Sequence, residues 1–126
     1  MHKGSCLCGA VRFEIEKPLK GPDACHCSQC RKVSGHVWAS TDLAEADLRL
    51  DGAENLTWFQ SSEKVRRGFC ATCGAALFWK PIFKDTIAVA MGAFETPTQT
   101  RLAMHIFVAD KGDYYEIADG VPQKPQ

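Results

Sequence analysis

The chain has 126 residues, a length typical of one domain, of which 45% are hydrophobic and 24% charged. This composition is that of a folded globular protein and excludes a disordered chain, which would hold fewer apolar residues. Fifteen basic residues balance fifteen acidic ones, so the basic excess of a general nucleic-acid binder is absent. No apolar run approaches the ~20 residues of a membrane-spanning helix, so we expect neither nucleic acid nor membrane as a partner.

The hydrophobic pattern repeats every two residues more often than every 3.6, which predicts an all-β fold of folded-over sheets or a sandwich. The first strand is expected at 10–16, where apolar and polar residues alternate. Further strands are expected in segments rich in Val, Ile, Phe, Trp and Thr, namely 36–41, 48–50, 56–60, 65–70, 76–80, 86–90 and 105–108. Short helical turns are expected only at 28–33 and 43–48. We expect a single domain over residues 1–121 and a frayed Pro-rich tail at 122–126.

Seven cysteines are the unusual feature of the composition, and disulfides within one chain cannot pair an odd number. All lie in three short motifs, C-x-C from residue 6, C-x-C-x-x-C from residue 25 and C-x-x-C from residue 70. The N-terminus lacks the apolar stretch of a secretory signal, which indicates a cytoplasmic protein, where clustered thiols bind metal more often than they oxidise. Zinc suits such thiolates best, at about 2.3 Å from each sulfur, and iron is the less favoured alternative.

We expect the seven cysteines to divide between two zinc ions. A structural zinc takes four ligands, which the two-cysteine motifs supply as Cys6, Cys8, Cys70 and Cys73. This zinc would join residues 6–8 to residues 70–73 and close a loop of about sixty residues. The third motif supplies Cys25, Cys27 and Cys30, and three ligands leave zinc one position for water or substrate, as in catalytic sites. The alternatives are a set of redox thiols, or one four-cysteine site with three spare thiols.

A zinc ion with three thiolates favours sulfur as its fourth ligand, so the motif indicates a thiol substrate whose carbon–sulfur bond is made or broken. Residues 25–27 in an extended conformation would present the cysteines on one side and His26 on the other, and a turn from Ser28 would return Cys30 to the same ion. Peptide hydrolysis is disfavoured because no H-E-x-x-H motif is present.

Basic residues follow or precede the cysteine motifs. Arg31 and Lys32 come directly after Cys30 and could bind the anionic part of a substrate thiol. Arg66 and Arg67, just before the C-x-x-C motif, could do the same or balance the charge of a zinc–thiolate site. For each of the four, a position on a solvated surface is the alternative.

The histidines allow structural as well as functional interpretations. His26 could support the metal ligands without binding the metal, transfer protons, or be packed and bonded to backbone. His105 heads an apolar run and is expected to be structural. His36 could face the same cleft as Cys30, whereas His2 is expected to be disordered at the terminus.

Four segments together carry a resemblance to a known family: GSCLCGAV at 4–11, CHCSQCRKVSG at 25–35, GFCATCG at 68–74 and the tail from His105 to Pro122. In them the sequence resembles the glutathione-dependent formaldehyde-activating enzyme family, whose relatives include centromere protein V. The resemblance implies a β-tent-like fold with structural zinc on Cys6, Cys8, Cys70 and Cys73 and a second zinc on Cys25, Cys27 and Cys30. It also implies a carbon–sulfur lyase that combines formaldehyde with glutathione into S-hydroxymethylglutathione. The alternative function is a non-catalytic zinc-binding module that recognises a partner protein.

Overall fold

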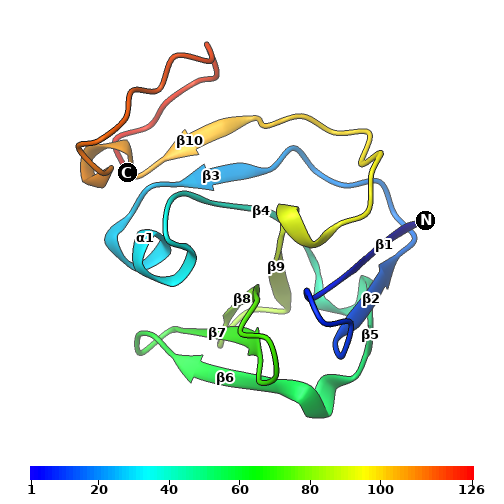
Figure 1. The fold of residues 1–126 in the computed structure, drawn as a ribbon. Helices are drawn as coiled ribbons and strands as arrows, with labels where there is room; N and C mark the ends of the chain where they lie inside the picture. The colour runs from blue at the N-terminus through cyan, green and yellow to red at the C-terminus, as the bar shows by residue number, and fades with distance from the viewer.

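A seven-stranded sheet and a three-stranded sheet, with one short helix, make up the fold (Figure 1). The computed structural model describes residues 1–126. The larger sheet has the order β10 (Met104–Ile106), β3 (Asp23–Cys25), β4 (Trp38–Ala44), β9 (Thr86–Ala90), β8 (Ala76–Pro81), β7 (Val65–Cys70) and β6 (Leu56–Gln60). The smaller one has the order β1 (His2–Ser5), β2 (Arg12–Ile15) and β5 (Leu48–Asp51). Neighbouring strands are antiparallel except β10 and β3, which are parallel. Two sheets with a single short helix confirm the predicted all-β class.

The two faces of the larger sheet pack against different elements. On one face, Phe78 and Val89 join Phe13 and Ile15 of the smaller sheet in the main hydrophobic core. The other face contributes a smaller cluster of Trp38, Ala88 and Ala90, which contacts Cys30. Cys30 belongs to α1 (Ser28–Ser34), which lies in the hollow of the curled larger sheet (Figure 1). The alternation of side chains along the central strands therefore builds two apolar layers, and the second lies beside the cysteine-rich helix.

Most strands lie where the alternating patterns predict them, and the differences have local causes. The pattern misses β1 and β3, which are short and carry no clean apolar alternation. His2 is ordered in β1, because backbone pairing with Ile15 holds it and its ring packs edge-on against Phe94. The turn expected at 43–48 is a 3₁₀ turn, η1 (Glu45–Asp47), since β4 continues to Ala44 in its pairing with β9.

Three further 3₁₀ turns lie in the connections, η2 (Ala53–Asn55), η3 (Met91–Ala93) and η4 (Val108–Asp110). None of the helical segments has the length and hydrophobicity needed to span a membrane.

The C-terminal residues pair with the sheet edge, in contrast to the predicted fraying at 122–126. The amide of His105 donates to the carbonyl of Pro122 at 2.8 Å, and the amide of Lys124 donates to the carbonyl of His105 at 2.8 Å. The amide of Ala109 donates in turn to the carbonyl of Pro125. Both prolines act through their carbonyl groups only, and a sheet edge tolerates their missing N–H donors. The tail therefore covers β10, next to the strand that carries Cys25.

The tight approach of Gly52 to the β1–β2 connection yields a stability prediction. Its φ is +82°, and a Cβ atom there would lie 2.0 Å from the carbonyl oxygen of Ala10. We expect Gly52→Ala to lower the free energy of unfolding by about 2 kcal/mol or more, because the left-handed backbone and the clash both act against it. Urea denaturation checks this against Gly92→Ala, whose Cβ would meet no atom within 4 Å. Equal stabilities of the two variants would contradict the prediction.

Candidate functional site

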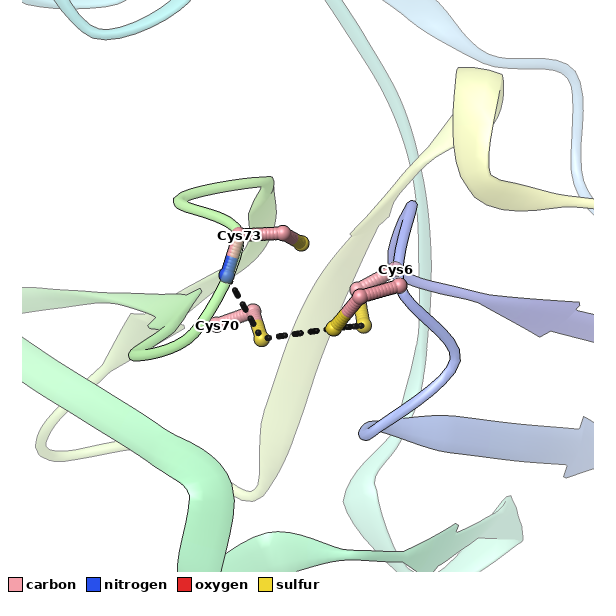
Figure 2. Close-up of side chains that lie close together, drawn as sticks. Cys6, Cys70 and Cys73 are labelled. Atoms are coloured by element: carbon pink, nitrogen blue, oxygen red, sulfur yellow. Dashed lines mark hydrogen bonds between the residues drawn. The ribbon is translucent and has the colours of Figure 1, made fainter.

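Four cysteines from two distant turns converge between the sheets and are called here the four-cysteine group. Cys6 and Cys8 lie in the connection from β1 to β2, whereas Cys70 ends β7 and Cys73 lies in the turn to β8. Figure 2 shows the turn that carries Cys6 opposite the turn that carries Cys70 and Cys73. All four Sγ atoms lie within 4.8 Å of one another, although 62 residues separate Cys8 from Cys70.

The spacing of these sulfurs fits a tetrahedral metal ion. Four thiolates about 2.3 Å from one zinc ion lie about 3.8 Å from each other. In the structure, Sγ of Cys8 is 3.6 Å from that of Cys6 and 3.8 Å from that of Cys70. Backbone amides point at two of the sulfurs, from Val11 to Cys6 at 3.3 Å and from Cys73 to Cys70 at 3.5 Å. Such N–H donors stabilise thiolates, so this group could hold a metal ion.

The second group, called the three-cysteine group, forms where β3 leads into α1. Cys25 ends β3, and Cys27 is the N-cap of α1, where its Sγ accepts a hydrogen bond from the amide of Cys30 at 3.4 Å. One turn of α1 brings Cys30 back, so all three Sγ atoms lie within 4.8 Å of one another. An extended segment followed by a helical turn is the geometry that the C-x-C-x-x-C spacing predicts. This group could also hold a metal ion, with three protein ligands.

The electrostatics of the three-cysteine group favour loss of one proton, that of Cys30. Hydrogen bonding from Cys25, with the charge of Arg67 adding, lowers the pKa of Cys30 to about 6. The same bond raises the pKa of Cys25, the donor. The guanidinium of Arg67 lies with Nη1 3.7 Å and Nη2 3.8 Å from Sγ of Cys30, and it is 6% exposed. A buried cation beside the sulfurs stabilises thiolates, the form in which cysteine binds metal.

A cavity of about 450 Å³ adjoins the three-cysteine group. The strand register explains its walls, because residues paired across neighbouring strands share a face of the sheet. One row pairs Ile106, Cys25 and Trp38, and another row pairs Arg67, Trp79, Ala88 and Asp42. All of these residues line the cavity, together with Asp23, Ser40, the three cysteines and further residues from the loops. A small molecule in the cavity would therefore lie against both the sulfurs and the indole rings.

The charges predicted beside the cysteines are arranged differently from the sequence-based expectation. Neither Arg31 nor Lys32 lines the cavity, and Lys32 is exposed. Of the two later arginines, Arg67 reaches the cavity, whereas the guanidinium of Arg66 lies 4.7 Å from the ring centre of Trp58. Adjacent residues of a strand face opposite sides, and this explains why only one of the pair reaches the cavity.

Carboxylates that no sequence motif indicates also line this cavity. Burial, and then the neighbouring charge of Asp23, raises the pKa of Asp42. The register places Asp42 at the opposite end of its row from Arg67. Alternation along β4 could have placed its side chain with Trp38 and Ser40, but only the pairing of β4 with β3 brings it near Asp23.

His26 lies on the far side of β3 from the cavity, as its position between two cysteines predicts. Its Nε2 is 2.8 Å from Nδ1 of His105, and its Nδ1 is hydrogen-bonded to the hydroxyl of Tyr115. Nε2 of His105 lies 2.8 Å from a carboxylate oxygen of Asp119. Burial, followed by the charge of His105, lowers the pKa of His26. Tyr115 and Asp119 lie in residues 111–126, called here the tail. No motif indicates their contacts, because only the folding of the tail beside β10 brings them to His26 and His105.

His36 is not among the cavity residues either. Its Nδ1 is hydrogen-bonded to the hydroxyl of Tyr114, an exposed residue of the same tail.

Comparison with known proteins agrees with this geometry. A protein of Halomonas elongata, provisionally named a glutathione-dependent formaldehyde-activating enzyme, is 31% identical over 91% of this chain and 80% of its own length. A Schizosaccharomyces pombe protein named as an uncharacterised lyase is 26% identical over 94% of this chain and 86% of its own length. A crystal structure of a Rhodobacter sphaeroides protein covers 75% of this chain and 89% of its own, with 31% identity and a TM-score of 0.62.

The names of the Halomonas elongata and Schizosaccharomyces pombe proteins support an enzyme, and the family model leads to the same assignment. The model described as glutathione-dependent formaldehyde-activating enzyme matches residues 1–110, a span that includes both cysteine groups. With most of the chain matched, and with two cysteine groups that could hold metal ions, the chain belongs to the glutathione-dependent formaldehyde-activating enzyme family.

Proposed function

We propose that the chain is a zinc-dependent carbon–sulfur lyase-type enzyme acting on a thiol adduct. The reaction is the combination of formaldehyde with glutathione into S-hydroxymethylglutathione, or the equivalent reaction of a related thiol. A carbon–sulfur bond forms in the forward direction, and the thiol proton ends on the new hydroxyl group. The cytoplasm is the proposed location, because all seven cysteines are free thiols and a reducing compartment keeps them so.

The observation that carries this proposal is the position of the three-cysteine group at the wall of the cavity. Three protein sulfurs are one fewer than a closed zinc site requires, whereas the four-cysteine group is complete. Cys25, Cys27 and Cys30 would hold the catalytic zinc, and Cys6, Cys8, Cys70 and Cys73 the structural one. When bound at the three-cysteine group, zinc supplies a sulfur-preferring Lewis acid that favours the thiolate form of a thiol.

The remaining cavity residues would bind and shield the reactants. Arg67 would offset the negative charge that several thiolates bring together, since its guanidinium already contacts Cys30. Trp38 and Trp79 would cover apolar parts of the substrate and exclude water. Arg31 and Lys32, which do not line the cavity, would act at most on a substrate part that extends beyond it.

Exchange spectroscopy by NMR tests the proposed reaction. With formaldehyde and glutathione present, we expect the wild-type chain to accelerate interconversion of free formaldehyde and S-hydroxymethylglutathione over the buffer rate. Cys27→Ser should return the rate to that of buffer while leaving the amide spectrum folded, because Cys27 lies at the start of α1 outside the main core. A wild-type chain that gives no acceleration at any pH would contradict the proposal and favour the partner-binding module.

Arg67 and Arg66 form a matched pair that tests the role of the cavity charge. We expect Arg67→Met to lower activity about ten-fold and to weaken metal retention, because the cysteine sulfurs lose their neighbouring cation. Arg66→Met removes the same charge from the opposite face of β7 and should behave as wild type. Initial rates and metal content measured on both variants decide the matter, and equal losses in the two would argue against a specific role for Arg67.

Removal of one sulfur from the four-cysteine group should destabilise the whole chain. Cys70 is fully buried and belongs to the join between the two sheets, so we expect Cys70→Ala to yield a protease-sensitive or insoluble chain. Cys25→Ala is the control, since it removes a sulfur from the three-cysteine group and leaves that join intact. Limited proteolysis compares them, and a Cys70→Ala chain as resistant as wild type and still holding its full zinc content would refute the structural role.

A further inference from the structure

A continuous chain of hydrogen bonds runs behind the three-cysteine group, from the C-terminal tail to β3 and back. It begins at the hydroxyl of Tyr115, passes through the rings of His26 and His105 and ends at the carboxylate of Asp119. The two imidazoles are 1% and 6% exposed, whereas Asp119 lies at the surface. Neither the proposed reaction nor the proposed metal ligands use these four side chains.

The bonds leave little freedom in the hydrogen positions. A carboxylate only accepts, so Nε2 of His105 carries a hydrogen. In the neutral ring Nδ1 of His105 is then an acceptor, and Nε2 of His26 must donate to it. Nδ1 of His26 accepts in turn from the hydroxyl of Tyr115. With both rings neutral, one arrangement satisfies every partner, and each ring is held in the Nε2–H tautomer.

The backbone connects these hydrogen bonds directly to the cysteines. His26 stands between Cys25 and Cys27, and its amide donates to the carbonyl of Ile106 at 3.0 Å. Its side chain is directed away from the cavity that both cysteines line. A rotation of the His26 ring and its backbone would therefore turn the flanking sulfurs relative to Cys30. A fixed ring would hold the three Sγ atoms where they lie, within 4.8 Å of one another.

We propose that His26 is a positioning residue for the three-cysteine group, held in one orientation by Tyr115, His105 and Asp119. Tyr115 and Asp119 lie beyond residues 1–110, the span of the family match, so the tail would be a working part of the metal site. The inference rests on the proposed metal site at the three-cysteine group. The experiment distinguishes a failure of the positioning role from a failure of that metal site.

The variants delete single partners at each end of the hydrogen-bond chain. Tyr115→Phe removes one hydroxyl, and Asp119→Ala removes an exposed carboxylate, so neither opens the main core. Their matched controls are Tyr114→Phe, the neighbouring tyrosine bonded to the exposed His36, and Asp113→Ala, another exposed acidic residue of the tail. His26→Gln tests rescue, because an amide can both donate and accept as the neutral ring does.

Two readouts decide the outcome, and neither requires activity. Long-range ¹H–¹⁵N spectra at pH 8 should show Nε2–H tautomers for His26 and His105, and Asp119→Ala should lose that of His105. In titrations with Co²⁺, the wild type should bind two ions, and both tail variants should bind one of them about ten-fold more weakly. The controls should match wild type, and His26→Gln should bind more tightly than His26→Ala.

The contrary results are distinct. Two wild-type-like affinities in Tyr115→Phe and Asp119→Ala would overturn the positioning role while the metal site stands. The positioning role would also be overturned if these two variants bound both ions more weakly and had lower melting temperatures to the same degree. The tail would then have a purely structural role. A different tautomer in the wild type would also overturn the positioning role. A wild-type chain that binds a single ion would overturn both this inference and the proposed function.

Discussion

The structure depends on the convergence of two turns that lie more than sixty residues apart, from Cys6 and Cys8 on one side and Cys70 and Cys73 on the other. The first turn belongs to the small sheet and the second to the large one, so their sulfurs join the two layers. Cys6 and Cys70 are also members of the main hydrophobic core, beside Phe13 and Phe78. Closing so long a loop opposes folding, and a metal ion that binds only the folded chain would offset that cost.

The candidate site lies beside the other group of cysteines, on the larger sheet. Its concave face carries paired rows of residues, and the register decides which of them meet at the cavity. Alternation along β7 sends Arg67 to the sulfurs and Arg66 to Trp58. Alternation into and beyond β3 sends Cys25 and Cys27 to the cavity and His26 to the tail. The same period of two residues thus separates the proposed reacting side of the site from its supporting side.

Local patterns in the sequence predict much of this arrangement. The strands at 56–60, 65–70 and 86–90 have the predicted bounds because β-branched and aromatic residues lie between clear turn signals. The cysteine spacings predict both groups of sulfurs, since a C-x-C or C-x-x-C motif restricts where its thiols can point. Because the cysteines within each motif are so close in sequence, the motif alone indicates which thiols lie together.

Local sequence patterns do not predict the contacts between distant segments. Arg31 and Lys32 adjoin the cysteines in sequence, yet Arg67, thirty-seven residues from Cys30, supplies the contact. Tyr115 and Asp119 reach His26 and His105 only because the tail pairs with β10. The prolines of the tail suggest fraying by composition, but their carbonyl groups supply the acceptors that hold it. These positions follow from tertiary pairing, which no local pattern records.

Metal content per chain, measured by mass spectrometry on the purified protein, tests the division of seven cysteines into four and three most directly. Two zinc ions per chain are predicted, one of which a mild chelator removes first because only three protein sulfurs hold it. A single zinc ion per chain, retained or lost in one step, would contradict the existence of a second, open metal site.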